Sequence, residues 1–93
     1  MGRQRRPQPK YLAKKLKAIR EELGLGQLEM SKQLSKLAVK LDGAKVSKFE
    51  RGEREPNLLE IVAYCELARL STDLLIDDRW SVKDLVWAMR QAQ

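Results

Sequence analysis

The chain has 93 residues, a formal net charge of +6 and an apolar content of 43%. This length accommodates one domain with a modest core, and no apolar run approaches the roughly 20 residues that a membrane-spanning helix requires. The chain contains no histidine and a single cysteine, Cys65. Histidine-based acid–base catalysis and a Cys/His zinc site are therefore excluded, and we expect neither an enzyme nor a cofactor.

The first residues and the cysteine indicate the compartment. Residues 1–7 are basic but lack the apolar segment of a secretory signal. Cys65 has no second cysteine with which to form an internal disulfide, as is typical of proteins in a reducing environment, and its apolar helix face predicts a small core residue. We therefore expect a cytoplasmic protein without membrane attachment.

Positive charge is concentrated in the first half of the chain. Residues 1–48 carry 13 Lys and Arg against 4 Asp and Glu, whereas residues 49–93 carry 6 against 9. This asymmetry is expected of a protein that presents one face to a polyanion, although solvated helix faces give the same pattern.

The first part of the chain is predicted to form an arm and two helices. Residues 1–9 contain two prolines and several basic residues and form a basic N-terminal arm. Apolar residues at helical spacing predict a first helix that ends at Gly24, where glycine can take the left-handed conformation. A second helix begins near Gln27. Residues 36–41 continue the apolar stripe of that helix, so they either extend it or form a loop.

Four further helices are predicted downstream. The third is capped by Asp42 and ended by Gly52, and the fourth begins at a capping box that starts with Asn57. A short fifth helix is capped by Ser71 or Thr72, and a sixth is capped by Ser81. The side chains expected to be buried by the third and fourth helices are Val46, Phe49, Leu58, Ile61, Val62, Cys65 and Ala68.

Several motifs then occur in a characteristic order. Leu16-Lys17-x-x-Arg20-x-x-x-Gly24-Leu25-x-Gln27 is followed by Val46-Ser47-x-Phe49-Glu50-x-Gly52 and by x-Arg54-x-Pro56. Together they resemble the Cro/lambda-repressor type of helix-turn-helix transcriptional regulator. The resemblance implies an all-α, compact five-helix DNA-binding domain over residues 10–78. Such a domain binds double-stranded operator DNA, usually as a homodimer and more often as a repressor.

The resemblance also implies which residues contact DNA. Gln27 matches a phosphate contact at the start of the second helix, and a phosphate contact positions the protein without reading sequence. Lys48 is the best candidate to read guanine, whereas Ala44 can only touch a thymine methyl group. With so few base contacts, much of the affinity should come from phosphates or DNA shape. The full set assigned to the third helix and the loop after it is Gly43, Ala44, Lys45, Ser47, Lys48, Arg51 and Arg54.

One ion pair is expected to be structural. Arg20 and Glu50 match a pair that forms an internal salt bridge in many members of that family. Their positions agree with this assignment, since Arg20 follows the apolar Ile19 on the first helix and Glu50 follows the inward-facing Phe49.

The sequence departs from the family pattern in the connection between the second and third helices. Ser31 and Ser35 stand where a small residue and a glycine are usual, and Ser35 weakens the prediction of a tight turn. Gln27 and Val46 are 19 residues apart, about five more than is typical of the family. We therefore expect an extended connection, which affects how the third helix is presented.

Two terminal segments have alternative interpretations. The arm residues Arg3, Arg5 and Arg6 either follow phosphates or a minor groove, or form a solubilising tail. Residues 79–93 are predicted to add a C-terminal helix that forms a dimer interface, the alternative being that they pack on the domain's own core. The residues assigned to dimerisation are Trp80, Val82, Leu85, Val86 and Met89.

Two other functions remain open at this point. The first is a protein-interaction module, such as an antitoxin or an anti-repressor partner, that uses the C-terminal segment or the fourth helix. The second is a protein that binds nucleic acid through its basic half without sequence preference.

Overall fold

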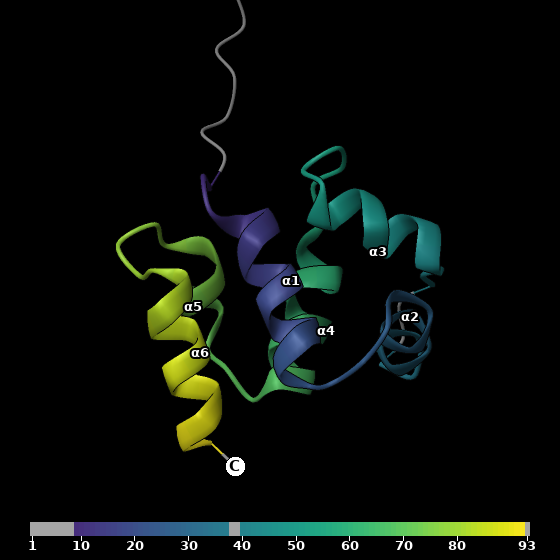
Figure 1. Cartoon of the computed structure of the whole chain (residues 1–93). Coiled ribbons are helices and arrows are strands. Elements are labelled where there is room, and N and C mark those ends of the chain that lie inside the picture. The colour runs from purple at the N-terminus through teal and green to yellow at the C-terminus, as the bar shows by residue number, and fades with distance from the viewer. Residues whose placement is uncertain (1–8, 38–39, 93) are drawn as a thin grey trace, which may run out of the picture.

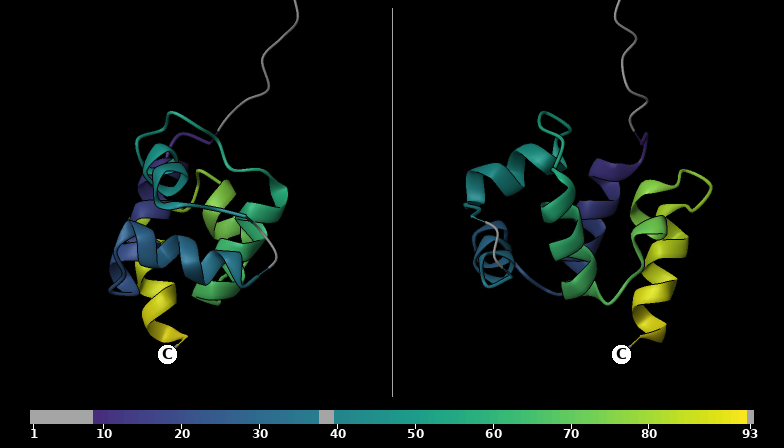
Figure 2. Two further views of the ribbon diagram at one scale, coloured as in Figure 1. Left: turned by 90° about the vertical axis from the view of Figure 1, so that its right-hand side faces the viewer. Right: turned by 180° about the vertical axis from the view of Figure 1, so that it is seen from behind.

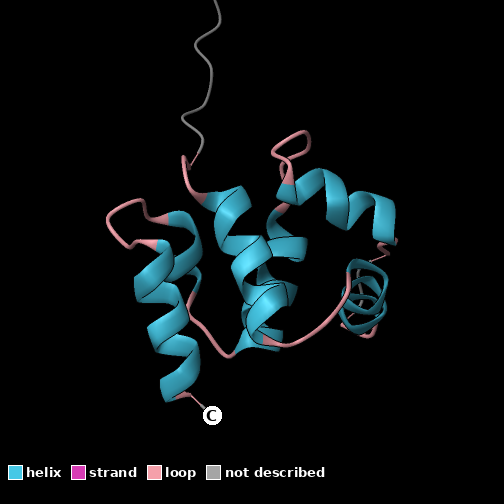
Figure 3. Ribbon diagram, viewed as in Figure 1, coloured by secondary structure: helices cyan, strands magenta, loops and turns pink. Residues whose placement is uncertain are grey.

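The computed structural model describes residues 9–37 and 40–92, which fold into helices without any strand (Figures 1 and 3). The all-α class predicted from the sequence is confirmed. Within these residues no helix is long and apolar enough to span a membrane. The helices are α1 (Leu12–Glu22), α2 (Gln27–Ser35), α3 (Gly43–Glu50), α4 (Leu58–Ala68), α5 (Thr72–Ile76) and α6 (Val82–Gln91).

Two glycines end helices in the predicted way. Gly24 has a φ of +72°, and the N–H of Leu25 donates to the carbonyl of Arg20 at 3.2 Å, so the chain turns back on the last turn of α1. Gly52 has a φ of +73° and ends α3 with the same geometry. These positive φ values favour glycine at both positions, because a Cβ atom would strain the backbone.

Three of the predicted side-chain caps are present, whereas Ser71 at the start of α5 makes no side-chain capping bond. The Asp42 carboxylate accepts a hydrogen bond of 2.8 Å from the N–H of Lys45 at the start of α3. At the start of α4, the N–H of Asn57 donates to Glu60, and Asn57 in turn accepts from the N–H of Glu60. Ser81 caps α6 by the same reciprocal arrangement. The sequence therefore determines these three helix starts locally.

α1 lies at the centre of the fold. In the views of Figures 1 and 2, α2 and α3 lie on one side of α1 and α4, whereas α5 and α6 lie on the other. Phe49 of α3 and Tyr64 of α4 contact each other edge to face, with ring centroids 6.5 Å apart. The buried apolar residues are Leu12, Leu16, Ile19, Met30, Leu34, Val46, Phe49, Ile61, Ala63, Tyr64, Cys65, Ala68, Leu75, Leu85 and Met89.

The predicted buried face of α4 needs a correction. Leu58 is 69% exposed, because it is the first residue of the helix and no other helix covers it there. Val62 is only half-buried. Tyr64 and Ala63 are buried instead, so α4 packs with a broader face than the predicted stripe.

α6 belongs to the core of the domain. Leu85 is 0% exposed and Met89 is 1% exposed, and both pack among the buried residues of the same chain. Their assignment to a dimer interface is therefore wrong, because the apolar face of α6 is already covered by α1 and α5. Val82 and Val86 are half-buried, and Trp80 is exposed.

Polar contacts also hold α5 and α6 against α1. The Nζ of Lys15, a fully buried residue, donates to the carbonyl of Asp77 at 3.1 Å, and burial lowers the pKa of this amine. At the other end of the interface, the guanidinium of Arg90 donates to Glu22 at 3.0 Å. The C-terminal helix is thus an integral part of the domain.

Candidate nucleic-acid interface

The pair formed by α2 and α3 carries most of the residues assigned to DNA. α2 contributes the buried Met30 and Leu34, and α3 contributes the buried Val46 and Phe49. These side chains hold the inner face of α3 against the fold and leave its outer face exposed. α3 is therefore anchored along its inner face and presents its outer face to solvent.

The predicted ion pair between α1 and α3 is present. The Nε of Arg20 lies 2.7 Å from Oε2 of Glu50, and its Nη2 donates to Oε1 at 3.1 Å. The two side chains are only 15% and 4% exposed. A third bond runs from Nη1 to the carbonyl of Leu25, and the hydrogen bond to Glu50 raises the pKa of Arg20. This clasp fixes the end of α3 to the turn between α1 and α2.

Gln27 is part of the same clasp. Its side-chain Nε2 donates to Oε1 of Glu50 at 3.2 Å, so the carboxylate accepts from two residues. The side-chain amide of Gln27 carries a second N–H, which still permits a bond to a phosphate oxygen. The sequence did not reveal this second role, because the bond joins residues that are 23 positions apart.

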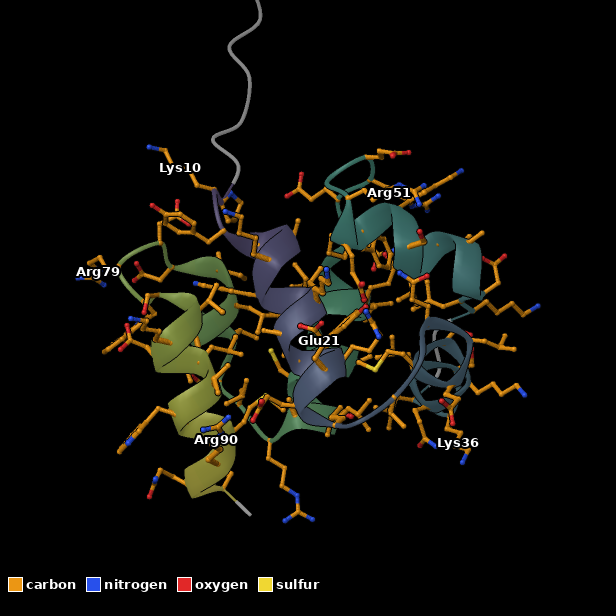
Figure 4. All side chains as sticks on the ribbon, viewed as in Figure 1. Lys10, Glu21, Lys36, Arg51, Arg79 and Arg90 are labelled. Carbon is orange, nitrogen blue, oxygen red and sulfur yellow. The ribbon has the colours of Figure 1, made fainter. Side chains whose placement is uncertain are left out.

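The two exposed residues of α3 and its C-cap residue, Arg51, form one stripe. Ala44, Lys48 and Arg51 are exposed and follow one another at intervals of four and three residues, which places them on the same face of a helix. Figure 4 shows Arg51 on the outer side of α3. Ser47 is half-buried beside this stripe, and Lys45 is half-buried outside it. Of the residues predicted to face DNA, Ala44, Lys48 and Arg51 thus share one exposed face, whereas Lys45 lies outside it.

The Arg51 side chain forms hydrogen bonds with two nearby residues, Glu53 and Ser47. Its Nε lies 2.5 Å from Oε2 of Glu53, and its Nη1 donates to the hydroxyl of Ser47. This pairing raises the pKa of Arg51 and lowers that of Glu53. The two charged side chains are 53% and 54% exposed, so water weakens the pair and a phosphate or a base edge can replace Glu53. The pairing of Glu53 with Arg51 was not predicted from the sequence, although the order Arg51-Gly52-Glu53 at the end of a helix places the two charged residues close together.

Gly43 lies beside α2. A Cβ atom at this position would lie 3.5 Å from the Cα of Leu28 on α2. This is an ordinary van der Waals distance, so the start of α3 lies beside the backbone of α2 without requiring glycine there. The assignment of Gly43 to a base contact finds no support in this packing.

The long connection before α3 is a loop over its described residues. α2 ends at Ser35, residues 36–37 form a turn, residues 40–42 are not helical, and residues 38–39 lie outside the described part. The Ser35 hydroxyl donates to the carbonyl of Ser31 at 2.8 Å and accepts from the N–H of Leu41 at 3.4 Å. Ser35 thus connects the two ends of this loop.

The loop after α3 lies beside the start of α1. A hollow of about 320 Å³ separates them, and its walls include Lys10, Phe49 and the exposed Arg54. Pro9, the first described residue, also lines this hollow. The candidate contacts Arg3, Arg5 and Arg6 themselves lie outside the described residues.

Comparison with protein-family models, with characterised proteins and with solved structures gives no match. The functional proposal therefore rests on the residues and their arrangement. In the described part of the chain, no three His, Cys, Asp or Glu residues are grouped as metal ligands. Cys65 is buried, and burial raises the pKa of its thiol to about 11.

Proposed function

We propose that this protein is a sequence-specific DNA-binding transcriptional regulator that inserts α3 into the major groove. The observation that carries the proposal is the exposed stripe of Ala44, Lys48 and Arg51 on a helix whose opposite face is anchored by Val46 and Phe49. An α-helix fits the major groove, and basic side chains on its outer face are the groups that bind base edges and phosphates.

The chemistry of the stripe suggests a division of roles. Lys48 reads guanine through O6 and N7, and Ala44 touches a thymine methyl group. Arg51 contacts a phosphate once its ion pair with Glu53 is broken, and Gln27 contributes a second phosphate contact from the start of α2. The resemblance to the Cro/lambda-repressor type supports the same assignment and favours a repressor.

The central test is a selection from a random double-stranded DNA library with the purified protein. We expect an enriched motif, whereas an unenriched library together with steeply salt-dependent binding would identify a nonspecific nucleic-acid-binding protein. Lys48→Ala should weaken binding to the selected site by about 1–3 kcal/mol and leave nonspecific binding nearly unchanged. Lys83→Ala on α6 is the matched control, because it removes the same charge far from α3 (Figure 1).

We include a homodimer in the proposal. Two copies would place their α3 helices in successive major grooves about 34 Å apart and require a pseudo-palindromic site. Deleting residues 79–93 would not test the dimer cleanly, because Leu85 and Met89 belong to the core. Sedimentation of the intact chain, with and without the selected DNA, tests the dimer directly. A single bound copy on an asymmetric site would refute it.

A second candidate function is a protein-interaction module. Leu58 and Leu59 are 69% and 68% exposed at the start of α4, and adjacent exposed leucines are typical of surfaces that bind another protein. This alternative predicts a partner that copurifies with the chain from its native host and is lost on Leu58→Ser together with Leu59→Ser. Persistence of the complex in this double variant would exclude the α4 surface.

A further inference from the structure

A hollow on the far side of the molecule from α3 has no role in the proposed DNA contacts. It lies between α5 and α6, has a volume of about 400 Å³, and is lined in part by Asp73, Leu74, Trp80, Asp84 and Trp87. Trp80 and Trp87 are 44% and 65% exposed, and they are the only two tryptophans of the chain. Two large indoles and two carboxylates thus share one open site.

The chemistry of this hollow favours a cation. Residues 71–84 contain four aspartates against one arginine and one lysine. Among the described residues, no donor is bonded to the carboxylate of Asp73, and Asp84 accepts its hydrogen bonds, all from Ser81, through a single oxygen, Oδ2. The faces of indole rings attract ammonium and guanidinium groups, and the planar guanidinium of arginine also stacks on them.

The first described residues of the chain are bonded to the loop that leads to Trp80. The backbone N–H of Lys10 donates to both carboxylate oxygens of Asp78, at 3.0 and 3.1 Å, and Asp78 is two residues before Trp80. Figure 4 shows Lys10 and Arg79 at the same end of the molecule. The arm that precedes Lys10 contains Arg3, Arg5 and Arg6.

The arm is long enough for contact. An extended chain spans about 3.3–3.6 Å per residue, so Arg6, four residues before Lys10, has a reach of roughly 14 Å, and Arg3 has a reach of roughly 25 Å. We propose that residues 1–8 of the same chain dock in this hollow, with arginine side chains against Trp80 and Trp87 and near the carboxylate of Asp73.

Docking has a consequence that rests on the proposed DNA-binding function. An arm held at the acidic face is withheld from phosphates, so the hollow and DNA compete for the same arginines. Asp73→Asn should then strengthen nonspecific DNA binding at low salt, because it weakens the competing site. The docking itself is tested without DNA, so failure of the DNA-binding proposal leaves that test intact.

Tryptophan emission measures docking directly, because both tryptophans line the hollow. We expect a variant lacking residues 2–8 to be quenched more strongly by acrylamide than the full chain at low salt. The difference should vanish near 1 M salt, where the screening length is about 3 Å. A synthetic peptide of residues 1–8 should restore protection at about millimolar concentration, the effective concentration that a short tether provides.

Three controls make the result specific. The same peptide with Arg3→Gln, Arg5→Gln and Arg6→Gln should have no effect, and Asp73→Asn in the full chain should reproduce the truncated variant. Glu21→Gln, which removes an exposed carboxylate of α1, should be quenched to the same extent as the unmodified full chain. Equal quenching of the full and truncated chains at low salt would overturn the proposal. Protection that disappears on dilution would also overturn it, since the arm would then come from a second copy.

Discussion

The clasp between Arg20 and Glu50 leads to a quantitative prediction about stability. In Arg20→Met, Glu50 keeps only the donor from Gln27, and the carbonyl of Leu25 loses its partner. Removing one partner of a buried ion pair costs about 3–5 kcal/mol, because the remaining charge is left without compensation in a poorly hydrated site. The 15% exposure of the Arg20 side chain places the expected loss near the lower end, at about 3 kcal/mol.

Urea denaturation measures this loss. With a slope of about 1 kcal/mol per molar, the midpoint should fall by about 3 M, and the melting temperature should fall by about 12–24 °C. Arg51→Met is the matched control, because it breaks an arginine–glutamate pair that is half-exposed, and it should leave the unfolding curve nearly unchanged.

A double-mutant cycle separates the ion pair from the loss of packing. Arg20→Met together with Glu50→Met should destabilise the protein less than the sum of the two single changes, because no charge remains buried alone. A loss below about 1 kcal/mol for Arg20→Met, or strictly additive losses, would show that the clasp is solvated and that this reasoning is wrong.

Three further predictions concern single side chains. The buried hydroxyl of Tyr64 has no hydrogen-bond partner among the described residues, so Tyr64→Phe should leave the unfolding free energy unchanged or raise it by about 1 kcal/mol; a clear loss in urea denaturation would contradict this. Cys65, whose pKa burial raises to about 11, should react with a disulfide reagent at pH 8 only after unfolding, and rapid labelling of the native protein would refute its burial. Hydrogen bonds from Arg79 lower the pKa of Asp77 to about 2, so the stabilisation is present above about pH 4 and is lost as the pH falls toward 2. Thermal unfolding of Asp77→Asn should therefore show a smaller loss of stability over this pH range, and identical acid profiles would disprove the linkage.

Much of this fold could be predicted from the sequence because its signals are local. Gly24 and Gly52 end helices through their own backbone freedom. Asp42, Asn57 and Ser81 each cap a helix through a bond to the residue three positions further along the chain. The apolar periodicity of the third and fourth helices also indicated five core residues, Val46, Phe49, Ile61, Cys65 and Ala68. These features depend on neighbouring residues only, so sequence alone determined the all-α class and the helix starts.

The site was predicted less completely. Lys48, Ala44 and Arg51 share the exposed face expected of them, but Gly43 lies against Leu28, and Glu53 pairs with Arg51. Such contacts depend on how two helices cross and on how a turn folds back. Helical spacing within one element does not contain that information.

The C-terminal segment and the arm show what only the tertiary structure decided. The apolar stripe of α6 fits a dimer interface and an internal core equally well, and its burial became clear only when α1 and α5 were seen to cover Leu85 and Met89. The hollow beside Trp80 and Trp87 likewise arises from the packing of α5 against α6. A sequence determines which faces are apolar or charged through the period of each helix, but which face meets which partner depends on contacts between residues far apart in the chain.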